Sequence, residues 1–219
     1  MMQAESVSPA KAAVIQRIGQ MKVVPVVRIA EYSRVFDIAR ALQSGGIPLI
    51  EITMTGSGVL EAVAQVRTVF VGDQCVIGVG TVTTPQAAEA AIQAGAQFIV
   101  SPILRPKIVE RCREHEVPVI CGAFTPTEAQ DAYEAGADMI KIFPIRALGA
   151  AYIKDLLGPL PHLRIVPTGG INFDNARTFI DAGVFAVGIG SEIVSQDMVN
   201  RGDWDTISQR AARALASVR

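Results

Sequence analysis

Short runs of apolar, β-favouring residues alternate along the chain with longer stretches in which apolar positions recur at helical spacing. We predict that eight of the apolar runs are strands, because each is short and is bounded by turn residues. These runs are 23–27, 49–53, 76–80, 98–101, 119–122, 139–143, 164–168 and 186–190. The stretches between and after them are predicted to be helices: 33–44, 58–70, 85–94, 106–114, 127–135, 150–157, 175–182 and 205–217.

The ends of these helices carry typical capping residues. Thr84 and Thr125 each precede a proline, a pattern that favours a helix start. Several helices end at a glycine just before the next strand, as a left-handed helix cap requires. These glycines are Gly46, Gly95, Gly136 and Gly183.

The alternation of strands and helices predicts a parallel sheet with helical crossovers, an α/β fold. Two closures fit, a doubly wound open sheet and a (β/α)8 TIM barrel. The count of eight favours the TIM barrel, and so do the conspicuous polar residues near the carboxyl ends of the runs. No linker divides the chain. We expect a single domain over residues 1–219, with 1–21 as an N-terminal extension that holds a short helix at 9–20.

Composition and charge exclude several classes of function. Half of the residues are hydrophobic and 19% are charged, so the chain can bury a large core. The formal net charge is −1 and the basic residues are scattered, which argues against nucleic-acid or membrane-surface binding. No apolar run approaches the roughly 20 residues that cross a bilayer. The N-terminus lacks the apolar segment of a secretory signal, so we expect a cytoplasmic protein.

The cysteines and histidines predict neither a metal site nor a cofactor. Cys75, Cys112 and Cys121 are odd in number and fit no metal or redox spacing, so we interpret them as reduced structural thiols. His115 and His162 lie far apart in polar segments and are predicted to be surface residues. A zinc site or a Ser-His-Asp triad has no support in this pattern.

Lys141 is the residue that most constrains the function. It lies inside the apolar run 139–143, where an ammonium group must leave water at a cost in free energy. Burial favours the neutral form of an amine, and a neutral amine is a nucleophile toward carbonyl carbon. The alternative is a lysine that ends its strand and reaches back to water. Two apolar residues follow Lys141 before Pro144, which argues against that alternative.

A second isolated charge, Glu51, lies at the matching place in run 49–53. Because side chains alternate along a strand, Ile50 and Ile52 face one way and Glu51 faces the other, as does Lys141 in its own run. Both runs are even-numbered strands, which supply side chains to the same interior layer of a barrel. An unpaired interior charge is prohibitive, whereas a pair is tolerable.

We therefore expect Glu51 and Lys141 to share one small cavity. Lys141 would attack the keto carbon of a 2-oxo acid, and Glu51 would carry protons through the reaction. A purely structural salt bridge is the alternative.

Glycine-rich turns follow the last two predicted strands. Gly169 and Gly170 follow run 164–168, and Gly190 and Ser191 close run 186–190. Glycines let backbone N–H groups approach an anion, and a short helix after the eighth strand is expected to direct its positive end there. This is the usual phosphate site of a TIM barrel. We therefore predict a phosphorylated substrate.

Other polar residues are expected around the mouth of the barrel. Thr81 and Pro102 are candidates for shaping the keto-acid pocket, and Arg28 for neutralising a carboxylate or phosphate. Thr55 extends the second strand and Phe143 lies beyond Lys141. For each of these residues, a role in packing or in a turn is an equally good interpretation. Arg105, Lys107 and Arg146 are either cations of the rim or solvated surface charges.

These motifs resemble those of the 2-keto-3-deoxy-6-phosphogluconate (KDPG) and 4-hydroxy-2-oxoglutarate (KHG) aldolases. The resemblance covers nearly the whole chain after about residue 20. It is carried by GIPLIEIT (46–53), GVGTV (78–82), IVSP (99–102), GADMIKIFP (136–144) and PTGGI (167–171). It implies a class I aldolase without metal or cofactor, usually a homotrimer, with the Schiff-base lysine at Lys141 and the proton-carrying glutamate at Glu51.

The resemblance also implies roles for the surrounding residues. The pyruvate-site residues of the family fall on Thr81, Pro102 and Phe143, and its phosphate loops fall on Gly169, Gly170 and Ser191. The commonest family pattern has an arginine where this chain has Thr55. Substrate preference is therefore open, and Arg28 is the candidate replacement for that arginine.

The resulting hypothesis is the reversible cleavage of KDPG to pyruvate and glyceraldehyde 3-phosphate. KHG and the galactonate epimer of KDPG are alternative substrates, and the expected partners are a 2-oxo acid and a phosphorylated aldehyde. A phosphosugar isomerase or epimerase would share the phosphate loops but need no imine. A non-catalytic metabolite-binding barrel would retain affinity without turnover.

Overall fold

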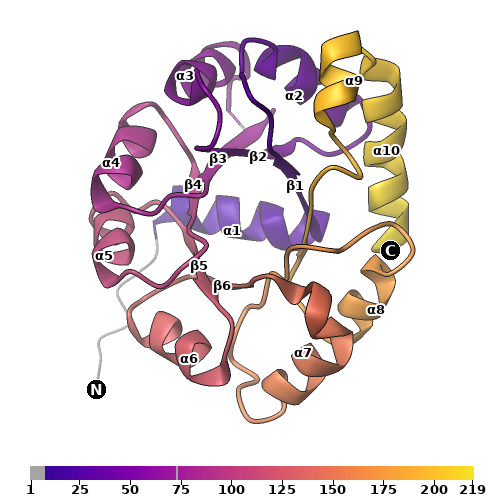
Figure 1. Ribbon diagram of the computed structural model, residues 1–219. Coiled ribbons are helices and arrows are strands. Elements are labelled where there is room, and N and C mark those ends of the chain that lie inside the picture. The colour runs from indigo at the N-terminus through magenta and orange to yellow at the C-terminus, as the bar shows by residue number, and fades with distance from the viewer. Residues whose placement is uncertain (1–7, 73) are drawn as a thin grey trace.

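Helices surround a curled layer of parallel strands in this chain (Figure 1). The computed structural model describes residues 8–72 and 74–219. The strands are β1 (Val23–Val27), β2 (Leu49–Thr53), β3 (Val76–Gly80), β4 (Phe98–Val100), β5 (Val119–Ala123), β6 (Met139–Ile142) and β7 (Val187–Ile189). They form a seven-stranded sheet in the order β6-β5-β4-β3-β2-β1-β7. The parallel α/β class predicted from the sequence is confirmed.

The helices follow the strands closely in sequence. They are α1 (Pro9–Met21), α2 (Val35–Ser44), α3 (Val59–Val69), α4 (Pro85–Gln93), α5 (Pro106–Glu114), α6 (Pro126–Glu134), α7 (Gly149–Leu157), α8 (Ala176–Asp181), α9 (Gln196–Arg201) and α10 (Trp204–Ser217), with a 3₁₀ turn η1 (Ile145–Ala147). Thr84 and Thr125 cap α4 and α6 by accepting backbone N–H bonds. Gly46, Gly95, Gly136 and Gly183 have φ values of 90° to 102°, as left-handed caps require.

The strand predicted at 164–168, the seventh of the eight runs, is a correction. Segment 164–168 is not a regular strand, although it lies between the two edge strands and bonds to both of them. One isolated bridge joins Ile165 to Ile140 of β6, and another joins Thr168 to Gly188 of β7. The N–H groups of Val166 and Thr168 bond to β6, but Pro167, whose carbonyl accepts from Gly188, has no N–H to donate toward β7, so the hydrogen bonds on that side are interrupted. The fold established by these bonds is a curled parallel sheet of seven strands.

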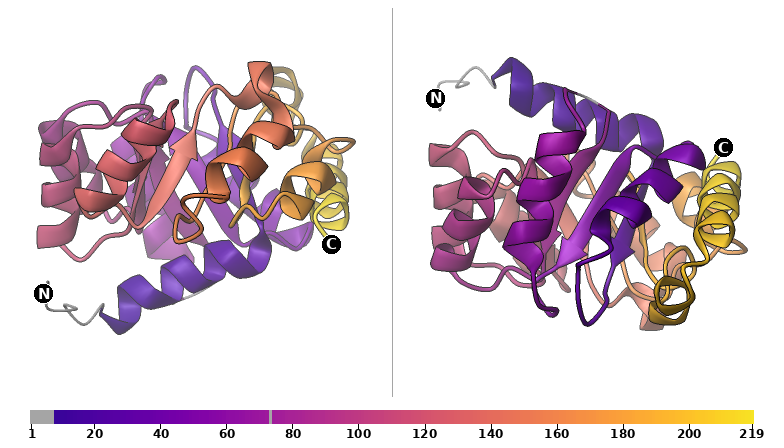
Figure 2. Two further views of the ribbon diagram at one scale, coloured as in Figure 1. Left: turned by 90° about the horizontal axis from the view of Figure 1, so that it is seen from below. Right: turned by 90° about the horizontal axis from the view of Figure 1, so that it is seen from above.

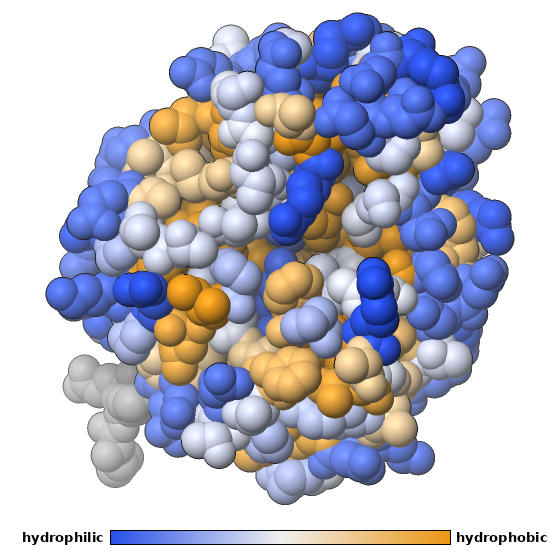
Figure 3. Space-filling model, viewed as in Figure 1, coloured by the Kyte–Doolittle hydropathy of each residue, from blue (hydrophilic) through white to orange (hydrophobic). Residues whose placement is uncertain are grey.

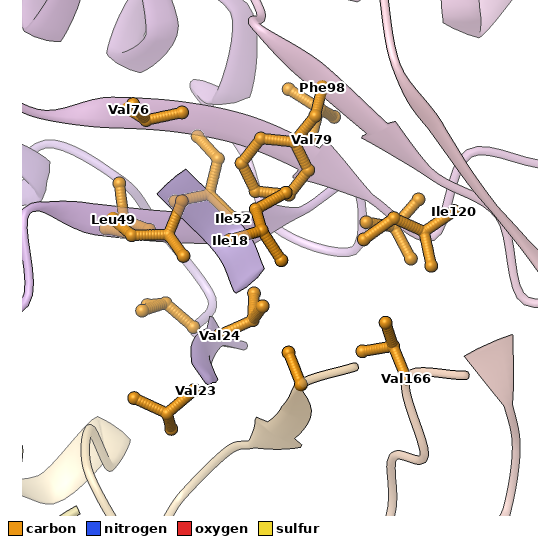
Figure 4. Close-up of a cluster of buried hydrophobic side chains, with 14 of the residues drawn as sticks. Ile18, Val23, Val24, Leu49, Ile52, Val76, Val79, Phe98, Ile120 and Val166 are labelled. Carbon is orange, nitrogen blue, oxygen red and sulfur yellow. The ribbon is translucent and has the colours of Figure 1, made fainter. Parts of the chain in front are cut away.

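Helix α1 covers the end of the sheet at which the strands begin (Figure 2). Its residue Ile18 is fully buried and joins a core of apolar side chains, most of them from the strands (Figure 4). Lys11 of α1 forms an ion pair of 2.8 Å with Asp138, the residue that precedes β6. Residues 1–7 of the predicted N-terminal extension lie outside the described residues. With one end closed by α1, the carboxyl ends of the strands form the accessible face.

Candidate active site

Lys141 and Glu51 meet inside the curled sheet, as strand alternation predicts. The Lys141 Nζ atom lies 3.9 Å from Glu51 Oε1, and the two residues are only 5% and 3% exposed. Lys141 is on β6 and Glu51 is on β2, and three strands separate β6 from β2 in the sheet. A contact across three strands is possible only if the sheet curls and both side chains point to its concave side. The roles of the two residues remain predictions.

Burial controls the protonation of Glu51. Loss of water raises the pKa of the Glu51 carboxyl, and the positive charges of Lys141 and Arg28 offset part of that rise. The Oε1 atom is buried and has no hydrogen-bond partner among the described residues. Such a carboxyl is not committed to a structural hydrogen bond at this atom, so it is available to take up and release a proton.

The end of β3 makes room for this carboxyl. A side chain at Gly80 would collide with the Glu51 Oε1 atom, so the pair depends on a glycine at that position. The next residue, Thr81, is half-buried and has φ of 59°. A left-handed conformation is costly for a β-branched residue, and such strain gathers at functional sites. The backbone conformation of Thr81 therefore supports its selection as a candidate site residue.

A buried hydrogen-bond network holds the end of β2 next to Glu51. The Tyr32 hydroxyl donates to the Val27 carbonyl at 2.7 Å and accepts from the Thr53 N–H at 2.9 Å. The Thr53 hydroxyl lies 2.8 Å from the hydroxyl of Thr55, which is exposed. Thr55 is thus fixed in place at the position where the resemblance leads one to expect an arginine.

A cavity of about 720 Å³ opens on the face opposite α1. Six of the predicted site residues line it: Arg28, Phe143, Gly169, Gly170, Gly190 and Ser191. Figure 3 shows this face, which is hollowed near its centre and carries strongly hydrophilic side chains beside the hollow. The other five do not line it: Glu51, Thr55, Thr81, Pro102 and Lys141. Pro102 is half-buried and follows β4.

Phe143 connects the reacting pair with the cavity. Its ring centroid lies 5.2 Å from Lys141 Nζ. A Cβ atom added at Gly169 would lie 3.1 Å from the same ring, so the glycine turn packs directly on Phe143. One aromatic side chain therefore contacts both the predicted nucleophile and the predicted phosphate loop.

Free backbone donors surround the far end of the cavity. The N–H groups of Gly169, Gly170, Gly190 and Ser191 donate to no acceptor in residues 8–72 and 74–219. The short helix expected after the last strand is α9, but it begins only at Gln196. A turn lies between, in which the N–H groups of Ile193 and Val194 return to the Gly190 carbonyl. An anion at this end of the cavity would therefore be bound by free backbone N–H groups of the turns and not by the N-terminus of a helix.

Several cavity residues were not predicted from the sequence. Asn172, Glu192 and Gln196 line the cavity together with Arg146, which had been assigned either to the rim or to the surface. Gln196 accepts a hydrogen bond of 2.7 Å from the Ala30 N–H and so ties α9 to the end of β1. Asn172 and Glu192 lie in irregular connections, Arg146 in the turn η1 and Gln196 at the first position of α9, where no periodic pattern signals that a side chain turns inward.

The histidines and cysteines do not line this cavity. His115 contacts Glu89 at 3.0 Å and His162 contacts Gln130 at 3.1 Å, both on the exterior. Burial raises the pKa of the three thiols, to about 12 for Cys75 and Cys112 and about 11 for Cys121. No group of three or more His, Cys, Asp or Glu side chains is arranged around a metal position in the described part of the chain.

None of the helices in residues 8–72 and 74–219 has the length and apolar character needed to span a bilayer.

Known proteins share both the sequence and the fold. The 2-dehydro-3-deoxy-phosphogluconate aldolase of Treponema pallidum (strain Nichols) is 34% identical over 210 residues, covering 94% of this chain and 97% of that protein. The KHG/KDPG aldolase of Escherichia coli (strain K12) is 31% identical over 195 residues, covering 88% and 90%.

A solved structure has a similar fold. It is the KDPG aldolase of Legionella pneumophila, with pyruvate captured at low pH as a covalent carbinolamine intermediate. It superposes with a TM-score of 0.84 at 28% identity and covers 94% of this chain and 97% of that one. The model of the family described as KDPG and KHG aldolase matches residues 14–210. The chain therefore belongs to the KDPG and KHG aldolase family, as its motifs indicated.

Proposed function

We propose that this protein is a class I aldolase that reversibly cleaves KDPG to pyruvate and glyceraldehyde 3-phosphate. The observation that carries the proposal is the buried contact of 3.9 Å between Lys141 Nζ and Glu51 Oε1 at the carboxyl end of the sheet. A buried amine beside a carboxyl with a raised pKa combines a nucleophile with a proton carrier.

Lys141 and Glu51 divide the reaction between them. Lys141 Nζ attacks the C2 carbonyl of the substrate, and the carbinolamine loses water to form a protonated imine. The C3–C4 bond then breaks and its electron pair passes into the imine, which becomes an enamine. As the aldehyde forms, the C4 hydroxyl loses its proton to Glu51. Glu51 returns this proton to C3, and water then releases pyruvate from Lys141.

The surrounding residues bind the two ends of the substrate. Arg28 lies close enough to Glu51 to lower its pKa, so its guanidinium is placed to receive the substrate carboxylate near the reacting carbons. Thr81 and Pro102 shape the pyruvate end, Phe143 packs beside the imine and Thr55 faces the middle of the substrate. The free N–H groups at Gly169, Gly170, Gly190 and Ser191 receive the phosphate.

KHG is a second candidate substrate. One relative of the chain is named as a KHG/KDPG aldolase, and Thr55 supplies a hydroxyl where the commonest family pattern has an arginine. A site that lacks this cation is expected to depend more on the phosphate for binding. KDPG is therefore the favoured substrate, and the galactonate epimer differs only in stereochemistry near Thr55.

Three structural features complete the proposal. We propose that segment 164–168 completes a closed TIM barrel, and its hydrogen bonds to both β6 and β7 support this. The single domain over residues 1–219, the homotrimer and the cytoplasmic location remain predictions from the sequence.

Trapping of the imine tests the proposal. The protein is incubated with pyruvate and sodium borohydride, and the modified peptide is identified by mass spectrometry. A pyruvyl adduct on Lys141, together with pyruvate release from KDPG in a coupled assay, is the expected result. Lys141→Ala is expected to abolish both. Trapping on another lysine, or none at all, would reject the imine route and favour a phosphosugar isomerase.

A further inference from the structure

Arg146 forms part of the cavity wall beside the glycine turn. It lies in η1, immediately after β6, and lines the same cavity as Gly169 and Gly170. A Cβ atom added at Gly170 would lie 2.8 Å from Arg146 Cβ and 3.1 Å from its Nε. The side chain therefore packs over the turn, and only a glycine leaves space for it.

The Arg146 guanidinium is available to a ligand. The side chain is exposed and has no carboxylate within 4.0 Å among the described residues. By contrast, Arg177 and Arg201 on the outer helices are held in ion pairs by Asp181 and Asp197. Glu192 also lines the cavity, so the charged lining consists of two arginines and one glutamate.

The two cavity arginines follow different strands, Arg28 after β1 and Arg146 after β6. Arg28 acts on the pKa of Glu51 and so lies near the reacting pair. Arg146 lies over Gly170, where backbone N–H groups have no acceptor. Backbone N–H groups orient an anion but carry no net charge, whereas a guanidinium adds a full charge and two parallel donors that match phosphate oxygens.

We propose that Arg146 binds the phosphate of the substrate and thereby makes this enzyme selective for phosphorylated 2-oxo acids. This assignment rests on the proposed aldolase function. It adds the positive charge of one side chain to the backbone N–H groups proposed to bind the phosphate. Arg146 contacts the end of the substrate that does not react. It therefore contributes to binding of the ground state and the transition state alike, so its loss changes KM and leaves kcat nearly unchanged.

The test compares Arg146→Ala and Arg146→Lys with the wild type, and uses Lys107→Ala as a matched control. Lys107 is an exposed cation at the start of α5 and does not line the cavity. Steady-state constants are measured with KDPG and with KHG, which has no phosphate. Arg146→Ala is expected to raise KM for KDPG about tenfold, since a charge-assisted hydrogen bond is lost.

For the same variant, kcat with KDPG and kcat/KM with KHG are expected to stay within about twofold of the wild-type values. Arg146→Lys keeps the charge without the bidentate geometry, so an intermediate KM is expected.

Inorganic phosphate gives a readout that does not depend on turnover. Its dissociation constant, measured by calorimetry, is expected to rise about tenfold in Arg146→Ala and to stay unchanged in Lys107→Ala. An unchanged phosphate affinity in Arg146→Ala, or equal rises in KM for KDPG and KHG, would overturn the assignment. A wild type that binds phosphate through Arg146 but cleaves neither substrate would reject the aldolase function and leave Arg146 as an anion ligand.

Discussion

Replacing Glu51 with glutamine removes the proposed proton carrier while preserving the shape of the side chain. The wild-type Oε1 atom accepts no hydrogen bond in the described part of the structure. The variant therefore loses little packing, and its fold is expected to survive. Lys141 keeps its place on β6 and is still able to attack a carbonyl carbon. The loss should therefore fall on the proton-transfer steps and not on imine formation.

The size of the effect follows from the geometry of the pair. Glu51 lies 3.9 Å from the nitrogen to which the substrate would be attached, within reach of C3 and the C4 hydroxyl. A positioned general acid or base contributes about 10² to 10⁴ in rate. At about 1.4 kcal/mol for each tenfold change, this corresponds to roughly 3–5.5 kcal/mol of barrier. We expect kcat for KDPG cleavage to fall by this factor.

Two assays separate the steps. Exchange of the pyruvate methyl protons with deuterium, followed by NMR, reports enamine formation and should slow by about the same factor. Borohydride trapping reports the imine and should still modify Lys141. Exchange and turnover within about threefold of the wild-type rates would refute the assignment, because a proton carrier cannot be removed at so small a cost.

The same variant has a pH signature in its stability. Burial raises the pKa of Glu51 above its ordinary value of 4.5, so the folded protein holds this proton to higher pH than the unfolded chain does. The associated stability is complete below 4.5 and is lost as pH rises through the raised pKa. In urea titrations, the free energy of unfolding of Glu51→Gln should therefore gain on the wild type as pH increases above 4.5. A difference that does not change with pH would contradict the shift.

Three further substitutions and probes test the supporting structure. Tyr32→Phe leaves a buried carbonyl and a buried N–H without their partner, and at about 1–3 kcal/mol for each group it should lower the urea unfolding free energy by roughly 2–6 kcal/mol; a loss below about 0.5 kcal/mol would show that water replaces the hydroxyl. Gly80→Ala drives a methyl group into the Glu51 carboxyl, so turnover should drop while trapping at Lys141 continues, and unaltered turnover would count against the contact. Ellman's reagent should find no reactive thiol at pH 8 until denaturant is added, because burial raises the pKa of every cysteine; rapid labelling of the native protein would contradict this for Cys75, Cys112 and Cys121.

The pairing of Lys141 with Glu51 could be predicted because strands obey a strict rule. Side chains alternate with a period of two, and the register of β1 to β6 runs continuously from one strand to the next. An isolated charge inside an apolar run can therefore lie on only one of two faces of the sheet. Because burying an unpaired charge is costly, the face that also carries an opposite charge is favoured. The prediction needed no knowledge of the loops.

The strand predicted at 164–168 shows where an apolar pattern is insufficient. Run 164–168 has the β-favouring residues Ile165 and Val166, and its neighbours do bond to it. An apolar pattern predicts that a segment is buried, but regular bonding to a neighbouring strand also requires a backbone N–H at every second residue. Pro167 supplies none. The segment lies between β6 and β7 and bonds to β6 through Val166 and Thr168, but its hydrogen bonds toward β7 are interrupted at Pro167.

Residues in loops could be predicted as candidates but not placed. Thr81 and Pro102 lie within two residues of strand ends, so their closeness to those ends was predictable, yet neither residue lines the cavity. Arg146 lies in a 3₁₀ turn without helical or strand periodicity, and its direction depends on a contact with Gly170 from a distant part of the chain. The groups proposed to react lie on strands, and the groups proposed to select the substrate lie on loops. Candidates for the reacting groups can therefore be predicted from the sequence alone, whereas the residues that contact the rest of a substrate require the folded connections.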